Sequence, residues 1–216
     1  MYETKQGTRS DLYTEPKSVK EALLIGEDME QTGRIKKLLF LDEENGSWTK
    51  KELRKFIEKV STEPHHIIVY FDGGFDQITK RAGLGLVIYY SQNNRSYRIR
   101  KNACVEELTT NNEAEYAALH LSMQELGWLG IERIPVTFIG DSQVVVNQLK
   151  DEWPCYDPVL NRWMDRIEDT VHQMRLTPTY QLISRKDNKE ADWLAGQALK
   201  EVNISSEIEI KNNGKW

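Results

Sequence analysis

Four acidic side chains of this sequence stand where an apolar segment ends or an amphipathic segment begins. Asp72 follows the apolar run 67–71, Asp141 follows the short apolar run 135–140, and Glu115 and Asp192 each fall in the first turn of a predicted helix. Strand ends and helix starts meet at one edge of an open α/β sheet, so we expect these carboxylates to lie together. Such an all-oxygen site suits two Mg²⁺ or Mn²⁺ ions, an arrangement that supports phosphodiester displacement.

Each acid also has an ordinary explanation. Asp72 with the following glycine is a common turn dipeptide, and Asp141 is a plausible helix N-cap. An acid near a helix start, such as Glu115 or Asp192, complements the helix dipole without binding anything. However, four acids that border buried surface repel one another unless cations bind between them, and this favours the metal site.

Gly73 and Gly74 follow Asp72 directly. Glycine permits a sharp turn of the backbone, and it also permits close approach of a bulky ligand such as a phosphate backbone. Both explanations stay open at this point.

The elements that position the acids follow from the hydrophobic pattern. Three segments joined by short turns predict antiparallel strands, and later segments alternate between helical and strand periods. The expected order is strands at 67–71, 82–90 and 96–100, a helix at 111–128, a strand at 135–140, helices at 142–149 and 160–174, a strand at 179–183 and a helix at 189–200. This order predicts an α/β domain with a mixed five-stranded sheet flanked by helices.

Three regions are expected along the chain. Residues 65–202 form the α/β domain, and residues 203–216 form a loose polar tail. Residues 1–64 form a small strand–helix appendage, in which the first 17 residues are frayed and a capping box at 49–52 opens a helix. This appendage is too small to stand alone. It either packs against its surroundings or provides a surface for a protein partner or self-association.

Composition bounds the class of protein. Apolar residues make up 39% of the 216 residues and charged residues 29%, as in globular proteins. No apolar run reaches the length of a membrane span and no secretory signal precedes the first element, so we expect a cytoplasmic protein without a membrane partner. Cys104 and Cys155 form no metal-ligand spacing and are expected to be reduced thiols. The net charge of −5 does not exclude nucleic acid, because cations bound to the acids would neutralise them.

Four segments of the chain resemble the motifs of the type 1 ribonuclease H family. They occur in the family's order and spacing over about residues 66–200, and their residues are most similar to those of the bacterial and archaeal reverse-transcriptase-like branch. The segments are Tyr-Phe-Asp-Gly-Gly at 70–74, Thr-Thr-Asn-Asn-Glu-Ala-Glu at 109–115, Gly-Asp-Ser-Gln at 140–143 and Arg-Lys-Asp-Asn-Lys-Glu-Ala-Asp-Trp-Leu-Ala at 185–195. The resemblance implies a ribonuclease H-like fold. It does not cover the N-terminal appendage.

The resemblance also implies an activity, namely hydrolysis of the RNA strand of an RNA–DNA hybrid to give 5′-phosphate and 3′-hydroxyl ends. By this analogy Asp72 bridges two Mg²⁺ ions, and Asp192 helps to hold the ion that activates the attacking water. Glu115 and Asp141 help to hold the ion that stabilises the leaving 3′ oxygen.

Further residues match family positions that contact the hybrid. Asn111, Asn112 and Gln143 match positions at its minor groove, while helix capping is the alternative for both asparagines. The remaining substrate-binding candidates are Ser142, Gly73, Gly74 and Arg185. Trp153 either stacks on the DNA strand or belongs to the core.

The chain departs from the family pattern in two places. Many members carry a histidine on the loop before the last acid, but the loop 183–188 has none and carries Arg185 instead. Arginine stays protonated, so it can contact phosphate but cannot act as a general base. The basic substrate-binding handle of many members is also missing near 150–153.

Two other functions are compatible with parts of the pattern. A non-catalytic module could bind hybrid or double-stranded RNA, although it would have no reason to keep four repelling acids together. A metal-dependent nuclease of the integrase or exonuclease type shares the chemistry, but it fits the Thr-Asn-Asn helix start poorly.

Overall fold

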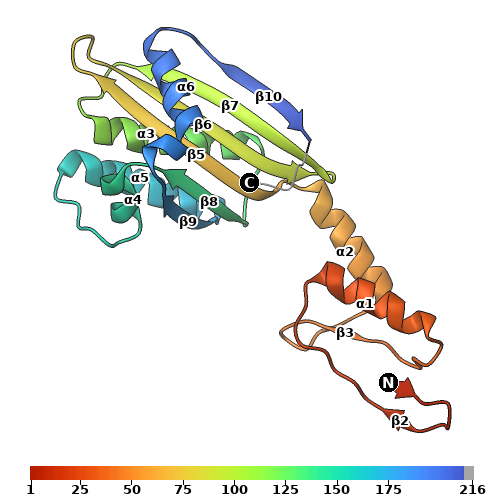
Figure 1. The fold of residues 1–216 in the computed structure, drawn as a ribbon. Coiled ribbons are helices and arrows are strands. Elements are labelled where there is room, and N and C mark those ends of the chain that lie inside the picture. Colours follow the sequence, from red (N-terminus) through yellow and green to blue (C-terminus); the bar gives the residue numbers. More distant parts are fainter. Residues whose placement is uncertain (212–216) are drawn as a thin grey trace. The chain divides into compact units, whose positions relative to one another are not determined.

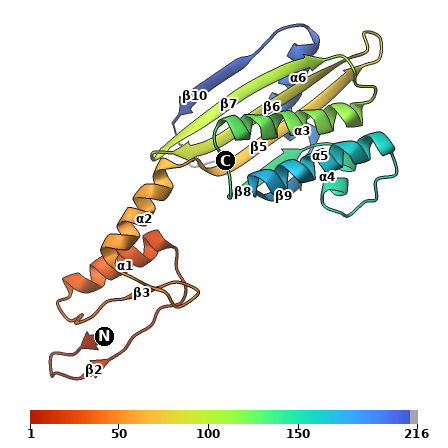
Figure 2. The same cartoon turned by 180° about the vertical axis from the view of Figure 1, so that it is seen from behind.

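The computed structural model describes residues 1–211 and divides the chain into two compact units. The first unit is Met1–Glu63, and the second begins at Pro64 (Figures 1 and 2). Each unit is described by itself below.

The N-terminal unit holds two helices and two short hairpins, whose strands have two residues each. Its elements are β1 (Tyr2–Glu3), β2 (Arg9–Ser10), α1 (Val19–Gln31), β3 (Phe40–Leu41), β4 (Ser47–Trp48) and α2 (Lys50–Thr62). Both helices begin with a capping box, and the one at Thr49 confirms the predicted start of α2. The expectation of a frayed start is wrong, because β1 pairs with β2 and the amino group of Met1 donates to the carbonyl of Lys37.

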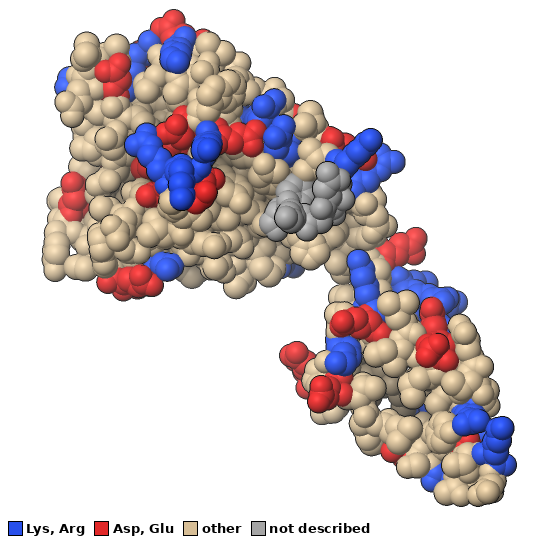
Figure 3. Space-filling view, in the orientation of Figure 1, with Lys and Arg blue, Asp and Glu red and all other residues tan. Residues whose placement is uncertain are grey.

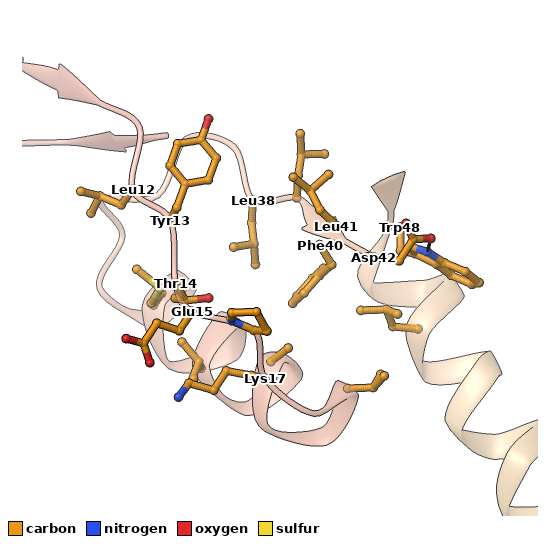
Figure 4. Close-up of a pocket in the computed structure, with 18 of the residues that line it drawn as sticks. Leu12, Tyr13, Thr14, Glu15, Lys17, Leu38, Phe40, Leu41, Asp42 and Trp48 are labelled. Carbon is orange, nitrogen blue, oxygen red and sulfur yellow. Dashed lines mark hydrogen bonds between the residues drawn. The ribbon is translucent and has the colours of Figure 1, made fainter. Parts of the chain in front are cut away.

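This N-terminal unit has a small core and an open apolar cavity. Leu23 and Leu53 are its buried large side chains, and a cavity of about 520 Å³ lies between α1 and the segments 12–17 and 37–43 (Figure 4). Gly26 of α1 meets the β3 segment, since a Cβ there would lie 2.8 Å from the Phe40 ring. Nothing in the structure shows what covers the cavity.

The second unit is built on one mixed six-stranded sheet. The strands are β5 (His65–Asp76), β6 (Arg81–Gln92), β7 (Arg95–Val105), β8 (Pro135–Gly140), β9 (Thr177–Leu182) and β10 (Ser205–Ile210). Their order across the sheet is β10-β7-β6-β5-β8-β9, antiparallel from β10 to β5 and parallel from β5 to β9. The helices are α3 (Asn111–Trp128), α4 (Gln143–Leu149), α5 (Pro158–Met174) and α6 (Lys189–Leu199), with a 3₁₀ turn η1 (Arg185–Asp187).

Helices cover both faces of this sheet. α6 crosses one face, and α3 and α5 lie on the other (Figures 1 and 2). Every residue of β6 from Ala82 to Ile88 is therefore buried, instead of buried and exposed residues alternating along the strand. The observed layers confirm the predicted α/β class with helices on a mixed sheet.

Two glycines of β6 let α6 lie directly on the sheet. A Cβ on Gly83 or Gly85 would lie 2.1 Å or 2.2 Å from the carbonyl oxygens of Ala195 and Ala191. No side chain fits between these backbones, so the height of α6 above the sheet is fixed by small residues on both sides. This contact also fixes the place of Asp192, which α6 carries.

The structure corrects two expectations about strand ends. β5 does not end at Asp72 but continues through Gly73 and Gly74 to Asp76, where the chain turns over residues 77–80. The turn explanation for Asp72 is therefore wrong. The segment 205–210, expected in a loose tail, is the sixth strand, and the rest of the expected tail from 212 to 216 lies outside the described residues. Within residues 1–211 we find no helix with the length and apolar character of a membrane span.

Candidate metal-binding active site

Three of the four predicted acids meet at one edge of the sheet. Carboxylate oxygens of Asp72, Glu115 and Asp141 all lie within 4.8 Å of one another. β5 and β8 are parallel and pair up to Tyr70 opposite Ile139, so Asp72 and Asp141 each stand two residues beyond the last pair. The register of these two strands therefore brings both carboxylates to the same level.

Glu115 reaches the cluster because α3 starts very close to β5. A Cβ on Gly73 would lie 2.1 Å from the carbonyl carbon of Ala114, so glycine is required for this approach. The backbone amide of Gly73 donates to the carboxylate of Glu115. Gly73 thus has a packing function, whereas a Cβ on Gly74 would have no heavy atom nearer than 3.9 Å.

Local helix chemistry does not explain these acids. The acid in the first turn of α3 is Glu113, which accepts from Thr109, while Glu115 lies further along the helix and is buried. The N-cap of α4 is Ser142, not Asp141. The dipole explanation for Glu115 and the capping explanation for Asp141 are both wrong.

Burial and mutual repulsion raise the pKa values of two acids of the cluster. Burial first, and then the nearby charges of Asp141 and Asp192, raise the pKa of Asp72 to about 7. The pKa of Glu115 is raised well above its ordinary value, first by burial and then by Asp72 and Asp141. One oxygen of Glu115, Oε2, is buried and has no hydrogen-bond partner among the described residues.

These properties fit a hard divalent cation. The donor set consists of oxygen atoms alone, as Mg²⁺ and Mn²⁺ prefer. A cation would satisfy the unpartnered oxygen of Glu115 and remove the repulsion within the cluster. The residues present therefore suit the metal that the sequence predicted.

The fourth predicted acid stands apart from the cluster. Asp192 lies in the first turn of α6, and its Oδ1 accepts from Arg185 Nη2 at 2.7 Å and from Arg185 Nε at 3.2 Å. Its charge still contributes to the raised pKa of Asp72. Asp192 is thus near enough to act on the site electrostatically while Arg185 occupies its carboxylate.

Asn188 is a site residue to which the sequence analysis assigned no role. Its side chain is only 1% exposed, and its Nδ2 donates to the carbonyl of Phe71 at 2.9 Å. Its backbone carbonyl accepts from the amide of Asp192 at 3.1 Å. The only signal in the sequence that could have marked it is the position of an asparagine directly before α6.

The predicted substrate residues around α3 differ in whether their side-chain amides already form a hydrogen bond. Thr110 is the N-cap of α3, so capping by Asn111 or Asn112 is wrong. The side-chain oxygen of Asn111 accepts from the amide of Phe75 at 2.8 Å, which leaves its NH₂ group to donate outward. Asn112 is half-buried and makes no side-chain hydrogen bond within the described part of the chain.

The candidates around α4 lie at the surface. Ser142 caps α4 by accepting from the amide of Val145, and Gln143 is the exposed first residue of that helix. Trp153, which follows α4, is 43% exposed, so its assignment to the core is wrong.

Residues 70–198 match the family model described as "Reverse transcriptase-like". The chain belongs to this branch of the type 1 ribonuclease H family. The six-stranded unit is accordingly a ribonuclease H-like domain, as the four motifs predicted.

Known ribonucleases H share this domain. Ribonuclease HI of Halobacterium salinarum is 34% identical over 93 residues, which cover 42% of this chain and 44% of that protein. The crystal structure of RNase H1 from Halobacterium salinarum matches with a TM-score of 0.54 at 26% identity, over 62% of this chain and 98% of the other. The crystal structure of LC11-RNase H1 in complex with an RNA/DNA hybrid matches with the same TM-score at 28% identity, over 62% and 97%.

Another relative extends beyond the ribonuclease H-like domain. The uncharacterized protein YpeP of Bacillus subtilis is 51% identical over 180 residues, which cover 83% of this chain and 79% of YpeP. This match is longer than the second unit, so it includes part of the N-terminal unit.

Proposed function

We propose that this protein hydrolyses the RNA strand of RNA–DNA hybrids with the help of Mg²⁺ or Mn²⁺, giving 5′-phosphate and 3′-hydroxyl ends. The observation that carries the proposal is the convergence of Asp72, Glu115 and Asp141, with one buried oxygen left unpartnered, on a ribonuclease H-like sheet. The likeness to LC11-RNase H1, which was solved with an RNA/DNA hybrid, supports the choice of substrate.

The acids would hold two ions between them. Asp72, Glu115 and Asp141 supply the clustered oxygens, and Asp192 would join them once its carboxylate is released from Arg185. When bound, the ions would lower the pKa of the attacking water and offset the charge that develops at the scissile phosphate. The protein then needs no nucleophilic side chain of its own.

Other side chains would position the hybrid. The free amides of Asn112 and Gln143 can donate and accept in the minor groove, where 2′-hydroxyl groups mark the RNA strand. The open space at Gly74 would let the sugar–phosphate backbone pass beside Asp72. Arg185, whose side chain is 80% exposed, offers a fixed positive charge to a phosphate.

Proton transfer would proceed without a histidine. The four histidines of the chain are His65, His66, His120 and His172, and none lies on the loop before Asp192. His120 packs edge-on against the ring of Trp163, and burial lowers its pKa. We propose that solvent takes up the proton in this protein. Both cysteines are free, in keeping with the cytoplasmic location that we also propose.

The test is cleavage of a hybrid labelled on its RNA strand, with Mg²⁺ or Mn²⁺ present. We expect the wild-type protein to cleave and Asp72→Asn to lose activity by several orders of magnitude. Asp76→Asn is the matched control, because Asp76 lies on the same strand but accepts from the turn residues Ile78 and Thr79 and is not one of the clustered acids. Equal cleavage by Asp72→Asn would refute the catalytic assignment. Tight hybrid binding without cleavage would identify a non-catalytic binding module.

A further inference from the structure

The outward face of α6 carries a line of residues that the proposed active site does not use. Lys189, Trp193 and Gly196 of α6 and its C-cap Lys200 follow one another at the i, i+4, i+7 and i+11 spacing, which places them on one side of the helix. We call these four residues the α6 surface. The opposite side of α6 is buried against the sheet, through Ala191, Leu194, Ala195 and Ala198.

Positive charge on the α6 surface is uncompensated. Three acids near α6 are engaged in ion pairs, since Glu190 pairs with Arg98 at 3.1 Å, Asp192 pairs with Arg185, and Glu201 pairs with Arg81. Asp187, just before α6, accepts a hydrogen bond from the hydroxyl of Ser184. Lys189 and Lys200, in contrast, form no ion pair with any residue between 1 and 211. Figure 3 shows basic side chains over the N-terminal end of α6, with acidic side chains among them. Such a surface is complementary to a polyanion.

Trp193 adds an accessible aromatic ring between the two lysines. It is 48% exposed and follows Asp192 directly, so the α6 surface begins at the rim of the proposed active site. An unpaired base can stack on such a ring, whereas the bases of a duplex are already stacked on one another.

Gly196, one turn after Trp193, leaves space beside the ring. No heavy atom lies within 4 Å of where its Cβ would be, and its φ is not in the left-handed region. Neither packing nor backbone conformation therefore requires glycine here, although glycine inside a helix is destabilising relative to alanine. Because residue 196 has no side chain, a planar base can approach the ring of Trp193.

We propose that the α6 surface binds a single-stranded nucleic-acid segment that extends from the hybrid held at the active site. An unpaired base stacks on Trp193, and Lys189 and Lys200 contact phosphates on either side. The two lysines are separated along the helix by roughly 16 Å, enough for a few nucleotides. The proposal rests on the proposed function, because that function places a hybrid at the acids next to Trp193.

The experiment measures binding by fluorescence anisotropy in EDTA, so that no strand is cleaved. The probes are a blunt hybrid and the same hybrid with a thymidine extension of about ten nucleotides at the 5′ or the 3′ end of its DNA strand. We expect the extension at one of these two ends to tighten binding by the wild-type protein relative to the blunt hybrid. Trp193→Ala should weaken binding of that probe by roughly tenfold and leave the blunt hybrid unchanged, while Trp193→Phe keeps most of the gain.

Charge reversal provides a second readout. Lys189→Glu should weaken binding of the extended probe and reduce the salt dependence of its affinity. Arg162→Glu is the matched control, because Arg162 is an exposed residue of α5, on the other face of the sheet, and it should change neither probe. Equal affinity of the wild-type protein for blunt and extended probes would refute the proposal, as would equal weakening of both probes by Trp193→Ala.

The experiment distinguishes failure of the α6 surface from failure of the proposed function. A gain from the extension that depends on Trp193, in a protein that cleaves no hybrid, would support the α6 surface and refute the ribonuclease activity. Cleavage of hybrids without any gain from an extension would refute the α6 surface alone.

Discussion

The side-chain amide of Asn188 donates a 2.9 Å hydrogen bond to the carbonyl of Phe71, the residue directly before Asp72. The backbone carbonyl of Asn188 accepts from the amide of Asp192. One residue therefore joins the strand that carries Asp72 to the helix that carries Asp192, and it sets the separation of these two acids.

Asn188→Ala should lower kcat through a change in this separation, with little change in KM, because Asn188 is buried away from the substrate. It should also lower the free energy of unfolding by about 1 to 3 kcal/mol, since the carbonyl of Phe71 loses its donor. Asn188→Asp keeps the shape but cannot donate when ionised, so it should behave similarly. Lys186→Ala, an exposed neighbour, is the control. Unchanged kcat in a destabilised Asn188→Ala protein would show that the residue serves stability alone.

The raised pKa of Asp72 predicts how the metal-free protein responds to pH. Its carboxyl loses a proton near pH 3.8 when unfolded and near pH 7 when folded, so the folded state holds more protons between these values. The free energy of unfolding should therefore fall as pH rises from about 4 to about 7. In EDTA, Asp72→Asn should be more stable than wild type at pH 8, by on the order of 2 kcal/mol, and this advantage should shrink at pH 5.

Chemical denaturation at the two pH values measures this difference. Adding Mg²⁺ at pH 8 should stabilise the wild-type protein and have less effect on Asp72→Asn, because the cation replaces the repulsion that the variant lacks. If the free energy of unfolding of Asp72→Asn exceeds that of the wild type by the same amount at both pH values, the assigned pKa is contradicted.

In the site as we propose it, Arg185 and a metal ion would compete for the carboxylate of Asp192, which accepts from Arg185 in this structure. Arg185→Gln should therefore lower the Mg²⁺ concentration needed for half-maximal activity. The pair is exposed to solvent and such pairs are worth about 1 kcal/mol or less, so the change should be no more than about fivefold. Lys186→Gln removes the same charge one residue away and separates competition for Asp192 from a general charge effect. The same shift in both variants would rule out competition.

The two glycines after Asp72 should respond differently to alanine. Gly73→Ala places a Cβ against the backbone of Ala114 and should destabilise the fold by about 3 kcal/mol as α3 is pushed away. Gly74→Ala meets only Leu199 at 3.9 Å and should fold normally. If a hybrid passes over this position, Gly74→Ala should raise KM for cleavage, while an unchanged KM would place the hybrid elsewhere.

Local signals in the sequence predicted most elements correctly. α5 follows its apolar spacing from Leu160 to Met174, and the capping box at Thr49 marks the start of α2. The convergence of Asp72, Glu115 and Asp141 also followed from the order of the elements, because parallel strands bring their ends to one edge.

The features that the sequence analysis missed depend on contacts between distant residues. The pair Gly73 and Gly74 predicts the end of a strand, yet β5 continues to Asp76 because it stays paired with β6. The burial of Asn188 depends on Phe71, which lies 117 residues earlier in the chain. The salt bridge of Arg185 to Asp192 depends on the conformation of η1, which the sequence pattern did not indicate.

The last strand has a practical consequence for any shortened version of this protein. β10 covers the outer edge of β7 from Ser205 opposite Lys101 to Ile210 opposite Ser96. A fragment that stops at residue 202 would contain every acid of the site but would leave the amides and carbonyls of β7 exposed to other chains. Bare sheet edges of this kind promote aggregation. An active but insoluble fragment is the expected result, and retaining the chain through residue 210 should restore solubility.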